Sequence, residues 1–169
     1  NAYLKQGQFR AATIEARNAI QKDVSNVEGH IAMANIYLGL GQYKEAVSQL
    51  EPLIGSNQNN AELARALIEG YLGRAKYQSA NTTLKNNATA LASLGASYKI
   101  LQARTLFGLG KKPAAIDLIT TAAKEYPNNV EILLTQAQFK AQLSEFDDIE
   151  AILTKINALD PNHAETDFF

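Results

Sequence analysis

The sequence predicts an all-α protein built as a solenoid of antiparallel helix pairs, and three observations support this prediction. A six-residue segment recurs at nearly constant spacing along the chain, which is typical of repeat proteins. Apolar residues between the recurrences follow the 3.6-residue period of α-helices. Hydrophobic residues make up 46% of the 169 residues, which is enough to form a sizeable core.

The recurring segment sets the predicted repeat boundaries. It occupies residues 7–12, 41–46, 75–80, 110–115 and 144–149, in steps of 34, 34, 35 and 34 residues. We therefore expect a single array across residues 1–169. Its parts are a partial repeat at 1–26, full repeats at 27–60, 61–95, 96–129 and 130–163, and the truncated start of a further element at 164–169. Because the chain begins and ends within this pattern, we expect it to be a fragment of a longer protein.

The elements of the first half follow from the pattern in order. Residues 1–7 are predicted to form the last turn of a helix and the turn after it. A wide apolar stripe predicts a helix over residues 27–40, and Gly41, which adopts positive φ readily, is expected to end it. A second helix is predicted over residues 44–54. The loop at 55–60 should cap the next helix, which begins at Ala61.

Prolines and asparagines mark irregular points in the predicted helices. Pro52 lies inside a predicted helix, where proline costs roughly 3 kcal/mol. Either that helix kinks near Ser48 or its last turn is a separate short piece. Residues 86–89 (Asn-Asn-Ala-Thr) should break the second helix of the 61–95 repeat. Pro113 lies at a predicted helix start, where proline is tolerated.

Small residues recur where the two helices of each pair should cross. Helix axes approach to roughly 8–10 Å only where the side chains between them are short. Four alanines recur at this place in successive repeats. They are Ala12, Ala46, Ala80 and Ala115.

The repeat resembles the tetratricopeptide repeat (TPR), whose helix–turn–helix unit also has 34 residues. The residues that carry the resemblance are Ala34 with Tyr37, Gly41 with Tyr43, Ala12 with Ala19, Ala115 with Ala122, and the closing prolines Pro127 and Pro161. It covers essentially the whole chain. It implies an all-α superhelical solenoid that binds protein partners.

The composition disfavours nucleic-acid binding, metal binding, histidine catalysis and membrane insertion. The 16 basic and 17 acidic residues give a net charge of −1, whereas nucleic-acid binders carry a basic excess. The chain has no cysteine and only two histidines, His30 and His163, which disfavours zinc sites and histidine catalysis. No apolar run approaches the roughly 18 residues of a membrane span. We therefore expect no enzyme, no metal, no cofactor, no nucleic-acid partner and no membrane insertion.

Four weaker motifs have structural explanations. Residues 108–112 (Gly-Leu-Gly-Lys-Lys) lack the spacing of a phosphate-binding loop and are predicted to be an inter-helix turn. The acids at 145, 147, 148 and 150 suit the first turn of a helix. His30 is expected to be a core or half-buried residue. The glycosylation sequons at Asn81 and Asn87 are chance matches in an asparagine-rich chain.

The resemblance implies that the first helix of each repeat lines a concave groove. The predicted partner-binding residues are Ile31, Asn35, Leu38, Arg65, Glu69, Leu72, Ile100, Arg104, Phe107, Leu134 and Gln138. Phe107 and Leu72 are expected to contact successive apolar residues of one bound peptide. The alternative is that several of these aliphatic residues pack against a neighbouring repeat and are not exposed.

The predicted function is a protein–protein interaction scaffold that binds a peptide or partner protein in this groove. The alternative is a structural spacer or self-assembling solenoid segment without a groove ligand. Self-association is expected through the exposed ends, which carry Tyr3, Leu4, Phe168 and Phe169. The 14 asparagines and 11 glutamines in a chain with 20% charged residues slightly favour a periplasmic or outer-membrane-associated bacterial protein. TPR lipoproteins of exopolysaccharide export are similar in this respect.

Overall fold

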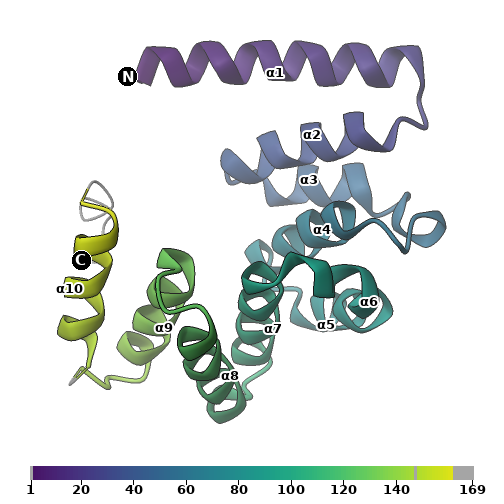
Figure 1. The fold of residues 1–169 in the computed structure, drawn as a ribbon. Helices are drawn as coiled ribbons and strands as arrows, with labels where there is room; N and C mark the ends of the chain where they lie inside the picture. The colour runs from purple at the N-terminus through teal and green to yellow at the C-terminus, as the bar shows by residue number, and fades with distance from the viewer. Residues whose placement is uncertain (1, 147, 162–169) are drawn as a thin grey trace. The chain divides into compact units, whose positions relative to one another are not determined.

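The computed structural model describes residues 2–146 and 148–161, with side chains from residue 9 onwards. Within these ranges the chain forms only helices, turns and loops, as predicted (Figure 1). It divides into two compact units, residues 1–94 and 95–169, and each unit is described by itself. None of the helices in the described ranges has the length and hydropathy needed to cross a bilayer. The further element predicted at 164–169 lies outside the described residues.

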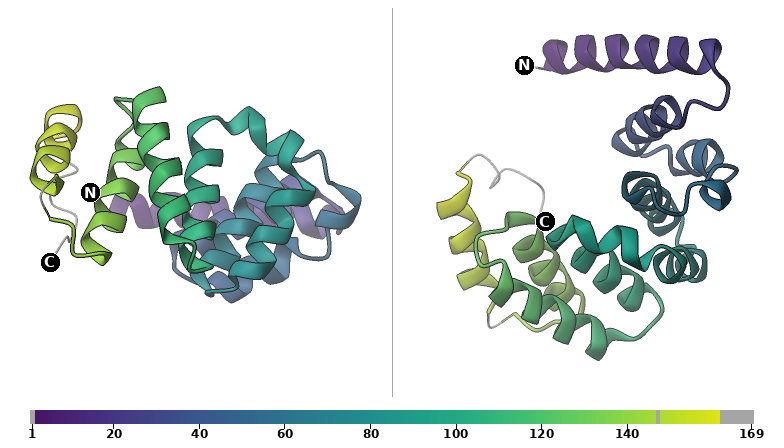
Figure 2. Two further views of the ribbon diagram at one scale, coloured as in Figure 1. Left: turned by 90° about the horizontal axis from the view of Figure 1, so that it is seen from below. Right: turned by 45° about the vertical axis from the view of Figure 1, so that its right-hand side comes forward.

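The first unit is a stack of helix pairs. Its elements are α1 (Ala2–Lys22), α2 (Val27–Gly39), α3 (Tyr43–Leu50), the 3₁₀ turn η1 (Ile54–Ser56), α4 (Ala61–Gly73), α5 (Tyr77–Asn86), α6 (Ala88–Leu91) and the 3₁₀ turn η2 (Ala92–Leu94). Helix α2 packs against α1, α3 and α4, and α4 also packs against α3, α5 and α6. The right-hand view of Figure 2 shows α2, α3 and α4 stacked on one another. No helix of this unit can bury its apolar stripe without its neighbours.

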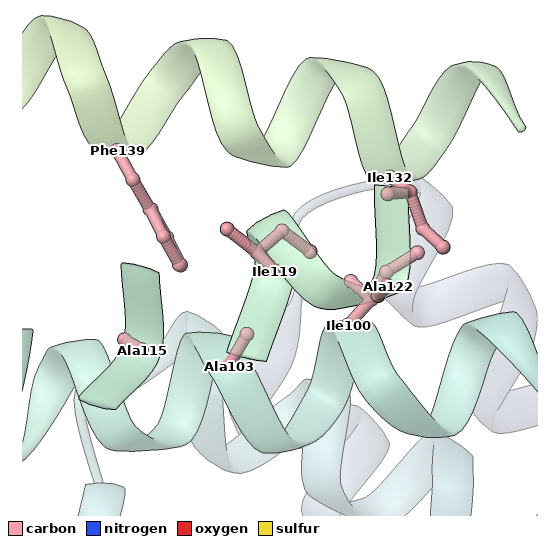
Figure 3. Close-up of a cluster of buried hydrophobic side chains, with 7 residues drawn as sticks. All are labelled: Ile100, Ala103, Ala115, Ile119, Ala122, Ile132 and Phe139. Atoms are coloured by element: carbon pink, nitrogen blue, oxygen red, sulfur yellow. The ribbon is translucent and has the colours of Figure 1, made fainter. Parts of the chain in front are cut away.

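The second unit repeats the arrangement with four helices. These are α7 (Ala96–Gly108), α8 (Lys112–Glu125), α9 (Val130–Gln142) and α10 (Ile149–Leu159). Helix α8 packs on α7 and α9, α7 also contacts α9, and α10 packs on α9. Figure 3 shows both side chains of α9 pointing toward α8, with Phe139 toward Ala115 and Ile119 and Ile132 toward Ala122. Pro113 lies in the first turn of α8, as predicted.

The turns between paired helices share one geometry. The second residue after the first helix of each pair has positive φ: +70° at Gly41, +53° at Ala75, +78° at Gly110 and +60° at Ser144. After α2, the amide of Gly41 donates to the Leu38 carbonyl and that of Gln42 to the Tyr37 carbonyl. The other three turns repeat both bonds at equivalent positions, which is the Schellman ending of a helix. The prediction for Gly41 is confirmed, but two of the four positions have a side chain.

Asparagine side chains start three of the four first helices. The side-chain oxygen of Asn26 accepts from the Gly29 amide, that of Asn60 from Leu63, and that of Asn129 from Ile132. Each bond satisfies an amide that the first turn of a helix leaves without a partner. The predicted capping function of the 55–60 loop is therefore confirmed at Asn60.

Both predicted irregularities occur. Helix α3 ends at Leu50, and the residues after Pro52 form the separate turn η1, so the second of the two alternatives for Pro52 is correct. Proline has no amide hydrogen to continue the helix and clashes with the preceding turn. The second helix of the 61–95 repeat is broken after Asn86 into α5, α6 and η2.

The prediction for residues 1–7 is wrong, because α1 runs without a break from Ala2 to Lys22. A glycine inside a helix costs only about 1 kcal/mol relative to alanine. Ala46, Ala80 and Ala115 are fully buried at the predicted crossings. Ala12, however, is exposed, and the helix that α1 packs against in the described part of the chain is α2.

Candidate functional site

In the first unit, the predicted groove residues form one continuous surface. Ile31, Asn35 and Leu38 follow one another on α2 at spacings of four and three residues, and Arg65, Glu69 and Leu72 do the same on α4. Such spacing places the three residues of each helix on one face. The two helices pack together, and Arg65 donates to the Asn35 Oδ1 atom across 3.0 Å. We name these six residues the α2–α4 face.

Arg65 is the centre of a polar network on this face. Its Nε atom donates to Glu62 Oε2 and its Nη1 atom to Glu69 Oε1, both at 2.8 Å. Burial opposes the guanidinium charge, but the two carboxylates outweigh this effect and raise the pKa of Arg65 above its ordinary value. The network holds one positive and two negative charges. Arg65 is thus paired within the protein, and the charge left over is negative.

The aliphatic residues of the α2–α4 face are partly accessible. Ile31, Leu38 and Leu72 are half-buried, whereas Asn35 is exposed. Each aliphatic side chain keeps some of its surface in water, although part of it packs within the unit. A partner could remove this remaining apolar area from water, which would stabilise a complex.

The predicted residues of the second unit are less accessible. Ile100 is 2% exposed and belongs to the core cluster, so it offers no binding surface. Phe107 stacks on Phe139, with ring centroids 4.2 Å apart, and the Lys112 ammonium lies 5.5 Å from the Phe107 centroid. Phe107 therefore packs against the core, although it is half-buried.

The remaining predicted groove residues of the second unit form few polar contacts with described residues. Arg104 is half-buried and contacts Thr135 Oγ1 at 3.5 Å. Leu134 is half-buried and Gln138 is exposed. Unlike the α2–α4 face, these residues show no ion-pair network among the described side chains. Among the predicted groove residues, those of the first unit therefore form the better-organised polar surface.

An open pocket of about 620 Å³ lies beside the α2–α4 face in the first unit. Its lining comes from the loop before α4, the first turn of α4 and the turn η2. The lining residues are Ser56, Asn57, Gln58, Asn59, Asn60, Ala61, Glu62, Ser93 and Leu94. Glu62 belongs both to this pocket and to the Arg65 network, so the pocket and the face are continuous.

His30 has a structural position. It is half-buried, as predicted, with Nδ1 2.8 Å from Gln49 Oε1 and Nε2 3.0 Å from the Val24 carbonyl. These contacts join α2 to α3 and to the loop before α2. Asn87, in one of the two sequons, is only 3% exposed. Among the described residues, no group of three or more potential ligands is placed to hold a metal ion.

Two features of the first unit were missed from the sequence. The Arg65 network was not predicted, although glutamates three residues before and four after an arginine are a recognisable signal. The second feature is an aromatic side chain, the third residue of the recurring segment, that packs on a glycine near the end of the next first helix. Phe9 packs on Gly39 in this way, and Tyr43 on Gly73. The 34-residue recurrence of glycine could have revealed this contact.

Comparison with known proteins agrees with this fold. Residues 3–69 match the family model described as Tetratricopeptide repeat. No curated protein matches the sequence.

Solved structures of other proteins are similar over most of the chain. A TPR protein of Thermus thermophilus is 17% identical with a TM-score of 0.79, covering 95% of this chain and 88% of that one. A tetratricopeptide repeat protein from Parabacteroides merdae is 16% identical with a TM-score of 0.78, and the match covers 91% of this chain and 60% of that one. MamA from Desulfovibrio magneticus is 16% identical with a TM-score of 0.70, and the match covers 94% of this chain and 89% of that one. These likenesses confirm the predicted all-α repeat fold.

Proposed function

We propose that this chain is a TPR scaffold whose first helices bind a peptide or a segment of a partner protein. The TPR fold in general is typical of protein–protein interaction. The observation that carries the proposal is the α2–α4 face, where Ile31, Leu38 and Leu72 stay half-exposed around the Arg65 network. An interface of this kind gains its free energy from a few apolar anchors, while polar groups fix orientation.

The face also disfavours catalysis as the main activity. Its only basic group, Arg65, is held by Glu62 and Glu69, and a general acid–base reaction needs a group free to exchange a proton with substrate. Binding requires no such group. The preorganised network keeps the side chains of both helices in place, which lowers the entropic cost of association.

A random peptide library displayed on phage and panned against the intact chain would test the proposal. Selected peptides should bind at least tenfold more weakly to the Leu72→Ser variant, because Leu72 supplies apolar area at the face. The matched control is Val24→Ser, which changes a side chain that is 77% exposed and lies outside the first helices. Equal binding of the selected peptides to Leu72→Ser and to the native chain would contradict the proposal.

A second candidate function is self-assembly, and the observation that favours it is Phe146. This residue occupies the place at which Tyr43 packs on Gly73 of the next first helix, yet Phe146 is 64% exposed. A helix from a second copy could cover it. Sedimentation should then show association that depends on concentration and is reduced by Phe146→Ser but not by Val24→Ser. The other residues predicted to drive association, Tyr3, Leu4, Phe168 and Phe169, have no described side chains.

We also propose a bacterial envelope location. What supports it is the amide-rich composition with few charges. A lipoprotein of the exopolysaccharide-export type remains part of this proposal. Fractionation of bacterial cells that produce the protein would test it: recovery in the cytoplasmic fraction alone would contradict an envelope location.

A further inference from the structure

The pocket beside the α2–α4 face is lined mostly by polar side chains, none of which is basic. Its polar lining consists of amides, hydroxyls and one carboxylate, that of Glu62, and it includes no lysine or arginine. The amides and hydroxyls both donate and accept hydrogen bonds and fit either charge, whereas the carboxylate only accepts and adds a full negative charge. Such a lining suits a donor-rich cation better than an anion.

Glu62 has capacity for a second partner. Its Oε2 atom accepts from Arg65 at 2.8 Å, whereas Oε1 accepts no hydrogen bond from any other described residue. The side chain is 53% exposed. One oxygen thus holds the carboxylate in place, while the other can accept a charge-assisted bond, which is roughly twice as strong as a neutral one.

Two nearby positive charges do not cancel this preference. Arg65 is also paired with Glu69 at 2.8 Å, so two carboxylates share one guanidinium. The N-terminus of α4 contributes about half a positive charge, and Asn60 already caps it by accepting from the Leu63 amide. Glu62 and Glu69 carry two negative charges against one guanidinium and this half charge, so the Arg65 network beside the pocket keeps a net negative charge.

We propose that this pocket binds a lysine or arginine side chain of the partner segment that lies on the α2–α4 face. The proposal rests on the proposed function, and it adds the chemistry of the partner: a basic residue flanked by apolar ones. Glu62 accepts the cation, and Arg65 positions Glu62 from its buried side. The asparagine and serine oxygens of the loop before α4 accept the remaining donor hydrogens.

The test uses peptides selected from the phage library on the intact native chain. They should share a lysine or arginine next to apolar residues. Replacing that basic residue by norleucine, which keeps the chain length but removes the charge, should weaken binding to the native chain about tenfold in fluorescence anisotropy. With the Glu62→Gln variant, the basic and norleucine peptides should bind within threefold of each other. The difference on the native chain should shrink at high salt, since part of it is electrostatic.

The matched control is Glu45→Gln, which changes an exposed glutamate of α3 outside the pocket. This variant should keep the tenfold difference. Selected peptides that lack a basic residue, or a tenfold difference that persists in Glu62→Gln, would overturn the cation pocket while leaving the scaffold proposal intact. Peptides that bind Leu72→Ser as well as the native chain would instead overturn the scaffold proposal. A library that yields no binder would overturn both.

Discussion

The four equivalent turns allow the cost of a side chain at positive φ to be measured within one protein. Gly41 and Ala75 occupy the same place in successive turns, with φ of +70° and +53°, and the same two hydrogen bonds close each turn. A Cβ atom built on Gly41 meets no heavy atom within 4 Å. Substitution there therefore changes the backbone energy without a steric clash. We predict that Ala75→Gly stabilises the protein and that Gly41→Ala destabilises it.

The magnitude follows from two opposing terms. A residue with a Cβ atom in the left-handed region costs about 1–2 kcal/mol relative to the right-handed region. Glycine offsets part of this gain, because it makes the unfolded chain more flexible by about 0.4–1 kcal/mol. The difference is about 1 kcal/mol, in favour of glycine at both positions. Ser144→Gly should have a similar effect, since Ser144 has φ of +60°.

Urea denaturation followed by circular dichroism in the far ultraviolet would measure both changes. The midpoint should rise for Ala75→Gly and fall for Gly41→Ala at unchanged slope, because the surface exposed on unfolding stays the same. A control is Ala75→Ser, which keeps a Cβ atom and should leave the midpoint nearly unchanged. If Ala75→Gly lowers the midpoint, positive φ at this turn carries no measurable strain and the reasoning is wrong.

Three further predictions concern packing and pH. Gly73→Ala should destabilise the protein by about 1–3 kcal/mol, because the new Cβ atom would clash with the Tyr43 ring. Adding Tyr43→Ala to the same chain should relieve the clash. Equal melting temperatures for Gly73→Ala and the native protein would contradict this prediction. Phe107→Ala should cost about 2 kcal/mol of unfolding free energy, since the half-buried ring stacks on the core; a native-like urea midpoint would make Phe107 a surface residue instead. Burial and the hydrogen bond to Glu51 raise the pKa of Tyr71 to about 12, from about 10 in the unfolded chain. The stability that this shift contributes is complete below about pH 10 and is lost as the pH rises toward about 12. The Tyr71→Phe variant should therefore show a smaller fall in melting temperature over that pH range.

Proximity along the chain explains what could be predicted. Helix periodicity, the turn at Gly41, the cap at Asn60 and the break after Asn86 depend on residues within about one helical turn of each other. The all-α repeat fold also follows from sequence, because a repeated unit repeats its local preferences. These features are confirmed by the structure.

Contacts between helices explain what could not be predicted. Sequence spacing placed Ile31 and Ile100 at the same groove position, yet Ile31 is half-exposed and Ile100 is buried in the core. Helical spacing gives the face on which a side chain lies, but neighbouring helices decide how much of that face they cover.

The candidate site shows the same division most clearly at Arg65. The sequence by itself determined that Arg65 and Glu69 share a face of one helix. Only the tertiary structure decided that Arg65 also reaches Asn35 on α2 and that Glu62 borders a pocket with η2. The physical reason is that these contacts join residues about 30 positions apart, and their geometry depends on how α2, α4 and η2 pack rather than on any local preference.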